Sequence, residues 1–289
     1  MQVTPPGSVP VTPTDGPGPL EVTRYDVAER VATITLHRPE RLNAWTAQMN
    51  AEYRSCLERA SDDAEVRVIV VTGSGRGFCS GAESEDLAGH VERGAYRSWD
   101  ADHLDRPGYG VRPEFDAELA YHFGIRKPVI AAVNGPALAG GFEIMLSCDL
   151  VVTIDTATFG IPEVKRGLMA GAGGLIRLPK RIPPTIALEL ALTGDPIDAH
   201  RALALGLVNR VVPADRLLDE ALALAGRIAE NAPLAVRASK RVMKQAGEVP
   251  DAQGWEINNA AVGEVFSSAD AMEGPAAFAE KRAPNWTGK

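Results

Sequence analysis

Residues 127–154 read KPVIAAVNGPALAGGFEIMLSCDLVVTI, and this stretch decides the predicted fold. Its first part, residues 128–133, is an apolar run typical of a strand that is covered on both faces. A glycine-rich turn at 135–141 and a short helix at about 142–147 follow, and Leu150–Ile154 predicts a second strand. A strand, turn, helix and strand in this order predict an α/β architecture with a largely parallel sheet.

The chain before this stretch supplies three more strands and a helix. Alternating apolar and polar residues predict a hairpin of half-buried strands at 20–25 and 31–36, joined by a polar link at 26–30. Asn43 is predicted as the N-cap of an amphipathic helix that ends at 62–63. A β-branched run at 66–72 predicts a further covered strand.

The C-terminal third is predicted to be helical. Ala, Leu and charged residues at helical spacing predict helices at 186–192, 199–205, 217–228, 233–245, 256–266 and 270–281. Their apolar faces suit either contact between subunits or packing on their own core. We therefore divide the chain into a disordered proline-rich tail (1–19), a core (20–200) and a helical C-terminal region (201–289).

Composition excludes several function classes. A net charge of −8 gives no general attraction to nucleic acid or to an anionic membrane. The three cysteines and five histidines show no metal-ligand spacing, and an odd cysteine count suits a reducing cytoplasm. No signal peptide or membrane-spanning run is predicted. The chain is thus expected to be a cytoplasmic protein with neither a membrane nor a nucleic-acid partner.

Two glycine-rich turns could bind an anion. The turn TGSGRG at 72–77 follows a strand, but its spacing is not that of a dinucleotide fingerprint, so a surface turn is the preferred interpretation. The backbone N–H groups of Ala82 and Gly140 could form a two-donor oxyanion hole. This requires the fold to bring their turns together, which spacing alone does not show, and each turn taken alone could be purely structural.

Two glutamates, Glu143 and Glu163, each follow a turn-forming segment. Two carboxylates that flank one water can serve as general base and general acid. Apolar neighbours surround Glu143, and burial there would raise its pKa as an acid catalyst requires. The alternative for Glu143 is an ordinary surface residue that complements the helix dipole.

Nine short stretches in a fixed order across about residues 20–285 carry a family resemblance. They are RPERLNA (38–44), GFCSGA (77–82), KPVIAAVNG (127–135), GGFE (140–143) through Cys148 and Asp149, FGIPE (159–163), GAGG (171–174), LTGD (192–195), GLV (206–208) and FAEKR (278–282). On these stretches the chain resembles the enoyl-CoA hydratase/isomerase, or crotonase, superfamily.

The resemblance implies a crotonase-type ββα spiral core with a helical C-terminal trimerisation region, and assembly as a trimer or a dimer of trimers. It implies an acyl-CoA thioester as substrate, with no further cofactor. It also assigns the catalytic and CoA sites to the core (20–200) and oligomerisation to the helical C-terminal region (201–289). The N–H groups of Ala82 and Gly140 would form the oxyanion hole, and Glu143 and Glu163 would be the two catalytic acids of a hydratase. Which glutamate is base and which is acid stays open.

The resemblance also implies a set of CoA contacts. They are Arg41, Leu42, Ala44, Ser80, Ala82, Glu83, Ser84, Phe278 and Lys281. The chain departs from the family pattern at Glu83 and Ser84, where Asp and Leu are common, at Glu85, where a lysine is frequent, and at Ala139, where a glycine is frequent. With the longer, aromatic stretch at 86–127, these departures predict an altered acyl pocket.

Retention of both glutamates favours hydration of the 2,3 double bond of an enoyl-CoA, or the reverse. The alternatives within the superfamily are an isomerase, a hydroxyacyl-CoA dehydratase or a hydrolase. An alternative of a different class is a non-catalytic acyl-CoA-binding protein, which the substituted residues at 83–85 would suit.

Overall fold

The structure is a computed structural model that describes residues 19–83, 122 and 124–289. The predicted proline-rich tail lies outside these residues except for its last position. Ser84 and most of the aromatic stretch at 86–127 also lie outside them.

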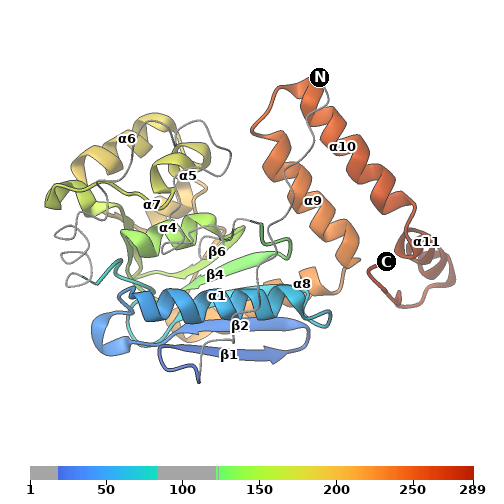
Figure 1. The fold of residues 1–289 in the computed structure, drawn as a ribbon, viewed down its shortest axis with the longest axis horizontal. Coiled ribbons are helices and arrows are strands. Elements are labelled where there is room, and N and C mark those ends of the chain that lie inside the picture. Colours follow the sequence, from blue (N-terminus) through green and yellow to red (C-terminus); the bar gives the residue numbers. More distant parts are fainter. Residues whose placement is uncertain (1–18, 84–121, 123) are drawn as a thin grey trace.

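A six-stranded sheet forms the centre of the molecule (Figure 1). In spatial order its strands are β1 (Thr23–Ala28), β2 (Val31–Leu36), β3 (Val68–Gly73), β4 (Val129–Val133), β6 (Leu150–Ile154) and β9 (Arg210–Val212). Only β1 and β2 pair antiparallel, and the other four pairs are parallel. The predicted α/β architecture with a largely parallel sheet is therefore confirmed.

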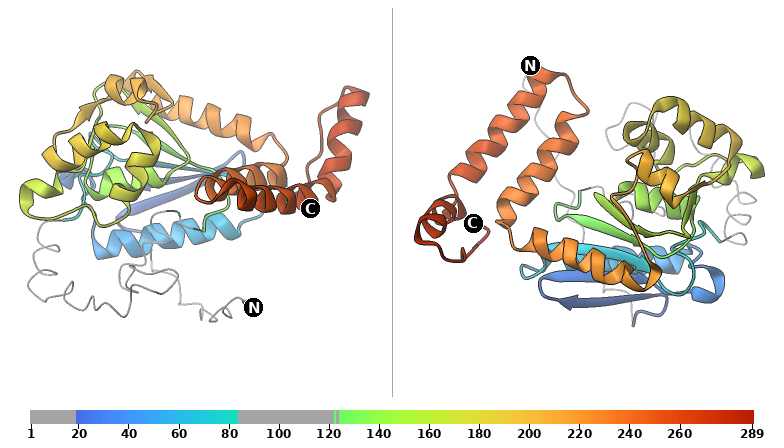
Figure 2. Two further views of the ribbon diagram at one scale, coloured as in Figure 1. Left: turned by 90° about the horizontal axis from the view of Figure 1, so that it is seen from above. Right: turned by 180° about the vertical axis from the view of Figure 1, so that it is seen from behind.

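Helices lie on both faces of this sheet, and its strands β3 and β4 are almost wholly buried. The helix α1 (Ala47–Asp62) contacts β1 and β2, whereas α8 (Leu217–Ala229) contacts β3, β4 and β6. Figures 1 and 2 show α1 in front of the sheet and α8 behind it. All five residues of β4 are buried, as expected for a strand covered on both faces.

The start of α1 differs from the prediction. Its N-cap is Thr46, whose Oγ1 accepts a hydrogen bond from Met49 N at 3.1 Å. Asn43, the predicted cap, is instead buried with a positive φ of 54°. Its Nδ2 donates to the carbonyl oxygens of Gly77 (2.8 Å) and Phe78 (3.2 Å). Asn43 therefore ties its own segment to the turn that precedes Ala82.

A second, three-stranded sheet positions the segments around both glutamates. It contains β5 (Ala137–Leu138), β7 (Thr158–Gly160) and β8 (Ile197–Asp198). The parallel pairing of β5 with β7 sets Leu138 opposite Gly160. Because both strands end at the same edge, the helix α4 (Gly140–Ser147) and the 3-10 helix η4 (Pro162–Arg166) begin side by side.

Further helices border this second sheet and close the core. They are α5 (Gly174–Arg181), α6 (Pro184–Thr193) and α7 (Ala199–Ala204), with the short 3-10 helices η1 (Pro39–Arg41) and η5 (Ala214–Arg216) elsewhere in the chain. The helix α5 contacts both α4 and α6.

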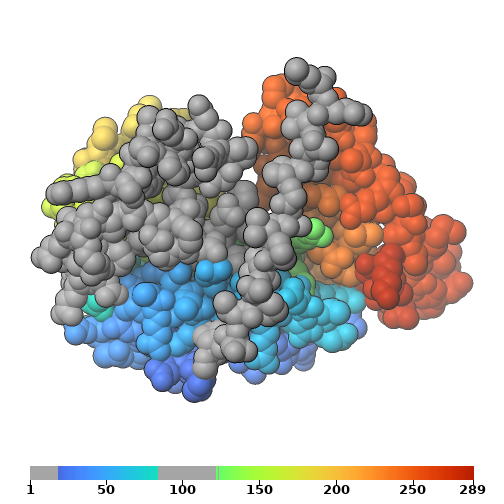
Figure 3. Space-filling model, in the orientation of Figure 1, coloured from blue at the N-terminus to red at the C-terminus, as the bar shows by residue number. Residues whose placement is uncertain are grey.

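The last three helices form a lobe beside the sheet. They are α9 (Pro233–Ala246), α10 (Asp251–Phe266) and α11 (Ala269–Glu280), and Figures 1 and 3 show them extending away from the core. The partly buried carboxylate of Asp149 anchors α9, since it pairs with Lys240 and Lys244 at 2.7 Å each. None of the helices in the described residues is long and apolar enough to span a membrane.

Candidate active site

The two turns that were predicted to supply oxyanion donors lie against each other. Leu138 N donates to the Cys79 carbonyl oxygen at 3.0 Å. A methyl group placed on Gly81 would lie 3.3 Å from Gly140 N, and one on Gly141 would lie 2.1 Å from Cys79 O. These glycines therefore permit a close backbone approach that a larger residue would block.

Within the described residues, the local hydrogen bonding leaves the N–H groups of Ala82 and Gly140 available. Trp45 N donates to Gly81 O at 2.8 Å, and Glu83 N donates to Trp45 O at 2.9 Å. This pairing uses the residues on either side of Ala82, whose own N–H has no acceptor among the described residues. Gly140 is the first residue of α4, and the first N–H groups of a helix have no acceptor within it.

Glu143 lies in the first turn of α4 and is buried, with 3% of its surface exposed. Its Oε1 accepts hydrogen bonds from Ala172 N and Gly174 N, at 2.8 Å each. A methyl group on Gly174 would lie 3.0 Å from Glu143 Cγ, so the bare glycine makes room for the carboxylate. Ala172 and Gly174 are positioning residues that the sequence analysis missed. The available signal was the GAGG stretch itself, which had no assigned role.

Glu163 lies in the first turn of η4, directly after Pro162. Its Oε2 is buried without a hydrogen-bond partner among the described residues. A buried polar atom without a partner is rare and marks a place where a ligand or water can bind.

Burial raises the pKa of both carboxyl groups. It raises the pKa of Glu143 to about 7, and the nearby charge of Glu163 adds to this rise, while the two N–H donors oppose it. Burial also raises the pKa of Glu163, and the charge of Arg166 opposes that effect. The structure thus places two mutually interacting carboxyl groups, each easier to protonate than an exposed one.

The predicted CoA contacts fall into two groups. Ser80 N donates to Leu42 O at 3.1 Å and Ser80 Oγ to Arg41 O at 3.5 Å, so the segments 41–44 and 80–83 lie side by side. The carboxylate of Glu83 pairs with Arg38 at 3.0 Å.

The C-terminal members of this set lie elsewhere. Phe278, in α11, is 88% exposed, and Lys281 follows at the end of that helix. Figure 1 places α11 far from α4 in the same chain. Within one chain the structure therefore does not bring Phe278 and Lys281 to the glutamates.

Among the described residues, neither a metal centre nor a reactive thiol accompanies this site. They contain no group of three or more His, Cys, Asp or Glu side chains placed to hold a metal ion. The thiol of Cys79 lies beside the site, but burial raises its pKa to about 12, so it is not a thiolate nucleophile.

Comparison with known proteins gives a consistent family. The family model for enoyl-CoA hydratase/isomerase matches residues 26–289. Carnitinyl-CoA dehydratase of Proteus mirabilis (strain HI4320) is 39% identical over 270 residues, which cover 90% of this chain and 95% of the relative. The crystal structure of enoyl-CoA hydratase from Mycobacterium tuberculosis H37Rv matches with a TM-score of 0.80 and 41% identity, over 93% of this chain and 99% of that one.

A solved enoyl-CoA hydratase from Bacillus anthracis has a TM-score of 0.82 at 32% identity and covers 93% of this chain and all of its own. These matches include the C-terminal helices as well as the sheet. The chain belongs to the enoyl-CoA hydratase/isomerase family and has the crotonase fold.

Proposed function

We propose that this protein adds water across the 2,3 double bond of an enoyl-CoA thioester and also catalyses the reverse dehydration. The observation that carries the proposal is the pairing of a buried carboxyl group, that of Glu143, with the partly buried one of Glu163, beside two N–H donors. An isomerase or hydrolase does not require two acids around one water.

The oxyanion hole would act on the thioester oxygen. In the proposed complex the N–H groups of Ala82 and Gly140 donate to that oxygen, which gains negative charge as C3 is attacked. Gly140 also lies at the N-terminus of α4, where the helix dipole favours negative charge. Removal of one such donor typically costs about 2.7–4 kcal/mol of transition-state stabilisation.

The two glutamates would divide the proton transfers. We assign Glu143 as the base, because two N–H groups on Oε1 stabilise its ionised form and leave Oε2 for a water. Glu163, whose Oε2 has no such donor, would carry the proton. The water oxygen bonds to C3 and gives its proton to Glu143, while Glu163 gives its proton to C2. The thioester carbonyl then re-forms. Glu143 releases its proton to solvent and Glu163 takes one up, so each turnover consumes one water and restores both carboxyl groups.

Dehydration is the same path in reverse. The names of the relatives called carnitinyl-CoA dehydratase support the proposal that this protein also catalyses that direction. Glu163 would then take the proton from C2, and Glu143 would protonate the leaving hydroxyl group. One pair of residues thus serves both directions, and the direction depends on the concentrations of the two thioesters.

The CoA part of the substrate is proposed to lie along the segments 41–44 and 80–83, which the structure holds together. Phe278 and Lys281 could contribute only from a second copy of the chain, and we propose that the protein assembles in that way.

The test uses crotonyl-CoA, whose conjugated thioester absorbs light and loses that absorbance on hydration. Glu143→Gln and Glu163→Gln should each lower kcat by at least about a hundredfold, the usual contribution of general acid–base catalysis. Glu189→Gln, an exposed residue of α6, is the matched control and should keep full activity.

Mass spectrometry of the product distinguishes the alternatives. Hydration adds the mass of one water, isomerisation leaves the mass unchanged, and hydrolysis releases free CoA. A fully active Glu163→Gln variant would contradict the two-acid mechanism.

A further inference from the structure

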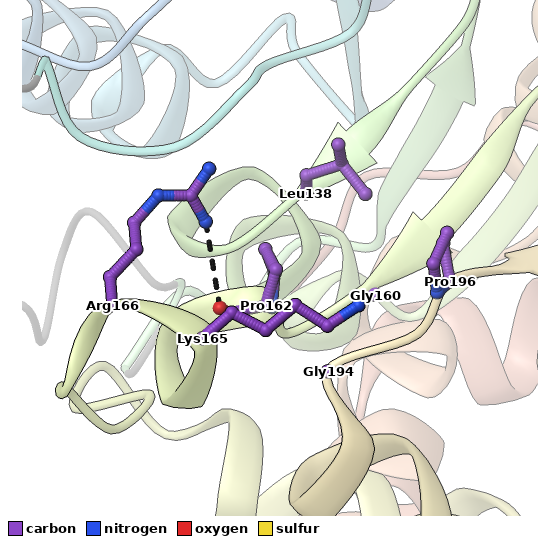
Figure 4. A pocket seen from close by; sticks show the side chains of 7 residues that line it. All are labelled: Leu138, Gly160, Pro162, Lys165, Arg166, Gly194 and Pro196. Atoms are coloured by element: carbon purple, nitrogen blue, oxygen red, sulfur yellow. Dashed lines mark hydrogen bonds between the residues drawn. The ribbon is translucent and has the colours of Figure 1, made fainter.

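A cavity of about 370 Å³ lies next to the candidate active site but is not lined by either glutamate. Its lining residues are Leu138, Gly160, Pro162, Lys165, Arg166, Gly194 and Pro196 (Figure 4). Leu138 precedes Ala139 and Gly140 in the chain, and Pro162 directly precedes Glu163. The cavity therefore shares its walls with the segments that carry the proposed oxyanion donor and the proposed acid.

Two basic side chains line this cavity in a protein whose net charge is −8. Lys165 forms an ion pair with Asp195, and both side chains are largely exposed. Arg166 has a different environment. Within the described part of the chain its guanidinium donates one long hydrogen bond, 3.5 Å to the Pro162 carbonyl oxygen, as Figure 4 shows. Most of its five N–H donors thus remain available for a ligand.

The remaining lining is apolar or lacks side chains. Leu138, Pro162 and Pro196 offer hydrocarbon surface. A methyl group on Gly194 would lie 3.2 Å from both Lys165 Cγ and Pro162 Cα, so the glycine keeps this wall of the cavity open. A ligand with a short hydrocarbon part and an anionic end matches these surfaces.

Because Leu138 and Pro162 line the cavity and lie next to the proposed oxyanion donor and the proposed acid in the chain, an acyl chain bound at the site could reach the cavity. In the proposed reaction C1 is at the oxyanion hole and C3 lies between the glutamates, so later carbons extend past Glu163. Arg166 is close enough to Glu163 for its charge to act on that carboxyl group. We propose that this cavity receives the far end of the acyl group and that the preferred substrates carry a carboxylate there, bound by Arg166.

This inference rests on the proposed function and narrows it to a substrate class. A guanidinium and a carboxylate form strong, charge-assisted hydrogen bonds, often two in parallel. A quaternary ammonium group, such as the one in a carnitinyl group, would be repelled by both Arg166 and Lys165. The acyl group that this protein prefers should therefore differ from the carnitinyl group in the names of the carnitinyl-CoA dehydratase relatives.

The kinetic test compares crotonyl-CoA with glutaconyl-CoA, which has the same double bond and a carboxylate at the far end. Wild-type kcat/KM should be about tenfold or more higher for glutaconyl-CoA, as expected for one charged hydrogen bond. Arg166→Gln should abolish this preference, mainly by raising KM for glutaconyl-CoA, and Arg166→Lys should keep part of it. Arg216→Gln, at an exposed arginine of η5 outside the cavity, should keep the wild-type ratio.

A binding test separates this inference from the proposed function. Glutaryl-CoA and butyryl-CoA are saturated at the 2,3 bond and cannot be hydrated, so calorimetric titration measures their binding even if no hydratase activity exists. Glutaryl-CoA should bind about tenfold more tightly to the wild type, and Arg166→Gln should make the two equal. Equal binding to the wild type, tighter binding of a trimethylammonium-bearing acyl-CoA, or an equal loss for both ligands in Arg166→Gln would overturn the inference.

Discussion

At the scale of single residues, the ionisation of Glu143 is coupled to folding. Burial raises the pKa of this carboxyl group from 4.5 to about 7. Because the folded state holds the proton more tightly than the unfolded state, the protein loses stability as the pH rises from about 4.5 through about 7. The carboxylate form is the one that burial disfavours.

Glu143→Gln should therefore stabilise the protein in a pH-dependent way. The amide cannot ionise, and its oxygen can still accept the hydrogen bonds from Ala172 and Gly174. The gain in the free energy of unfolding should be near zero at pH 4.5 and roughly 3 kcal/mol at pH 8, at about 1.4 kcal/mol per pKa unit. Urea unfolding of the wild type and of Glu143→Gln between pH 4.5 and pH 8 measures this gain, with Glu189→Gln as a control. A gain that is the same at every pH would show that ionisation is not the cause.

Gly174 gives a prediction about activity. A methyl group there would lie 3.0 Å from Glu143 Cγ and 3.1 Å from its Oε1, so Gly174→Ala should displace the carboxylate. We expect kcat to fall by about ten- to a hundredfold, since a misplacement of about 1 Å can have that effect. Gly171→Ala is the matched control, because nothing lies within 4 Å of its added methyl group. Equal kcat values for the two variants would show that the contact between residue 174 and Glu143 is not required.

At the scale of elements, the start of α4 depends on a close backbone contact. A methyl group on Gly141 would lie 2.1 Å from the Cys79 carbonyl oxygen, which forces α4 away from the segment 79–82. Gly141→Ala should lower the free energy of unfolding by about 1–3 kcal/mol, typical of overpacking, and should also lower kcat by separating the two oxyanion donors. Gly226→Ala, in α8 with open space around it, should instead raise stability by up to about 1 kcal/mol. Thermal unfolding and crotonyl-CoA turnover of both variants test this pair.

The regular elements could be predicted because their apolar patterns are local. Strands β2, β4 and β6 and the helices from α6 onward follow the predicted ranges to within a few residues, except that α10 begins at Asp251 and not near 256. The hairpin turn was misjudged. The predicted link at 26–30 is only Glu29 and Arg30, both with positive φ, and a turn of this kind normally uses Gly or Asn.

The second sheet and the meeting of the two turns could not be predicted from the residues alone. Strands β5, β7 and β8 have two or three residues each, too few for a periodic pattern. The contact between Gly141 and Cys79 O depends on the register of distant segments. Asn43 was wrongly predicted as a cap because its long-range bonds to Gly77 and Phe78 have no local signature. Only the family resemblance predicted that the turns around Ala82 and Gly140 meet.

At the scale of the whole molecule, the C-terminal lobe exposes large apolar side chains that a single chain leaves uncovered. Trp255, Phe266 and Phe278 are 66%, 76% and 88% exposed. Contiguous exposed apolar surface usually marks a contact with another molecule. Lys281 lies at the end of the same lobe, far from α4 of its own chain. The predicted assembly of three or six chains would give both features a role, because a second copy could cover the aromatics and receive Lys281.

Light scattering coupled to size-exclusion chromatography tests this assembly. The wild type should elute as a multiple of the 30.7 kDa chain, and Phe266→Asp should shift it toward the single chain, because burial of a charge in an apolar contact is unfavourable. Ala47→Asp, at an exposed position of α1, should not change the mass.

Lys281→Ala should keep the assembly but raise KM for crotonyl-CoA. Activity restored by mixing inactive Glu143→Gln chains with Lys281→Ala chains, beyond the sum of the two, would show that one chain supplies the glutamates and another the lysine. A wild type that runs as a single chain with an ordinary KM would contradict this arrangement.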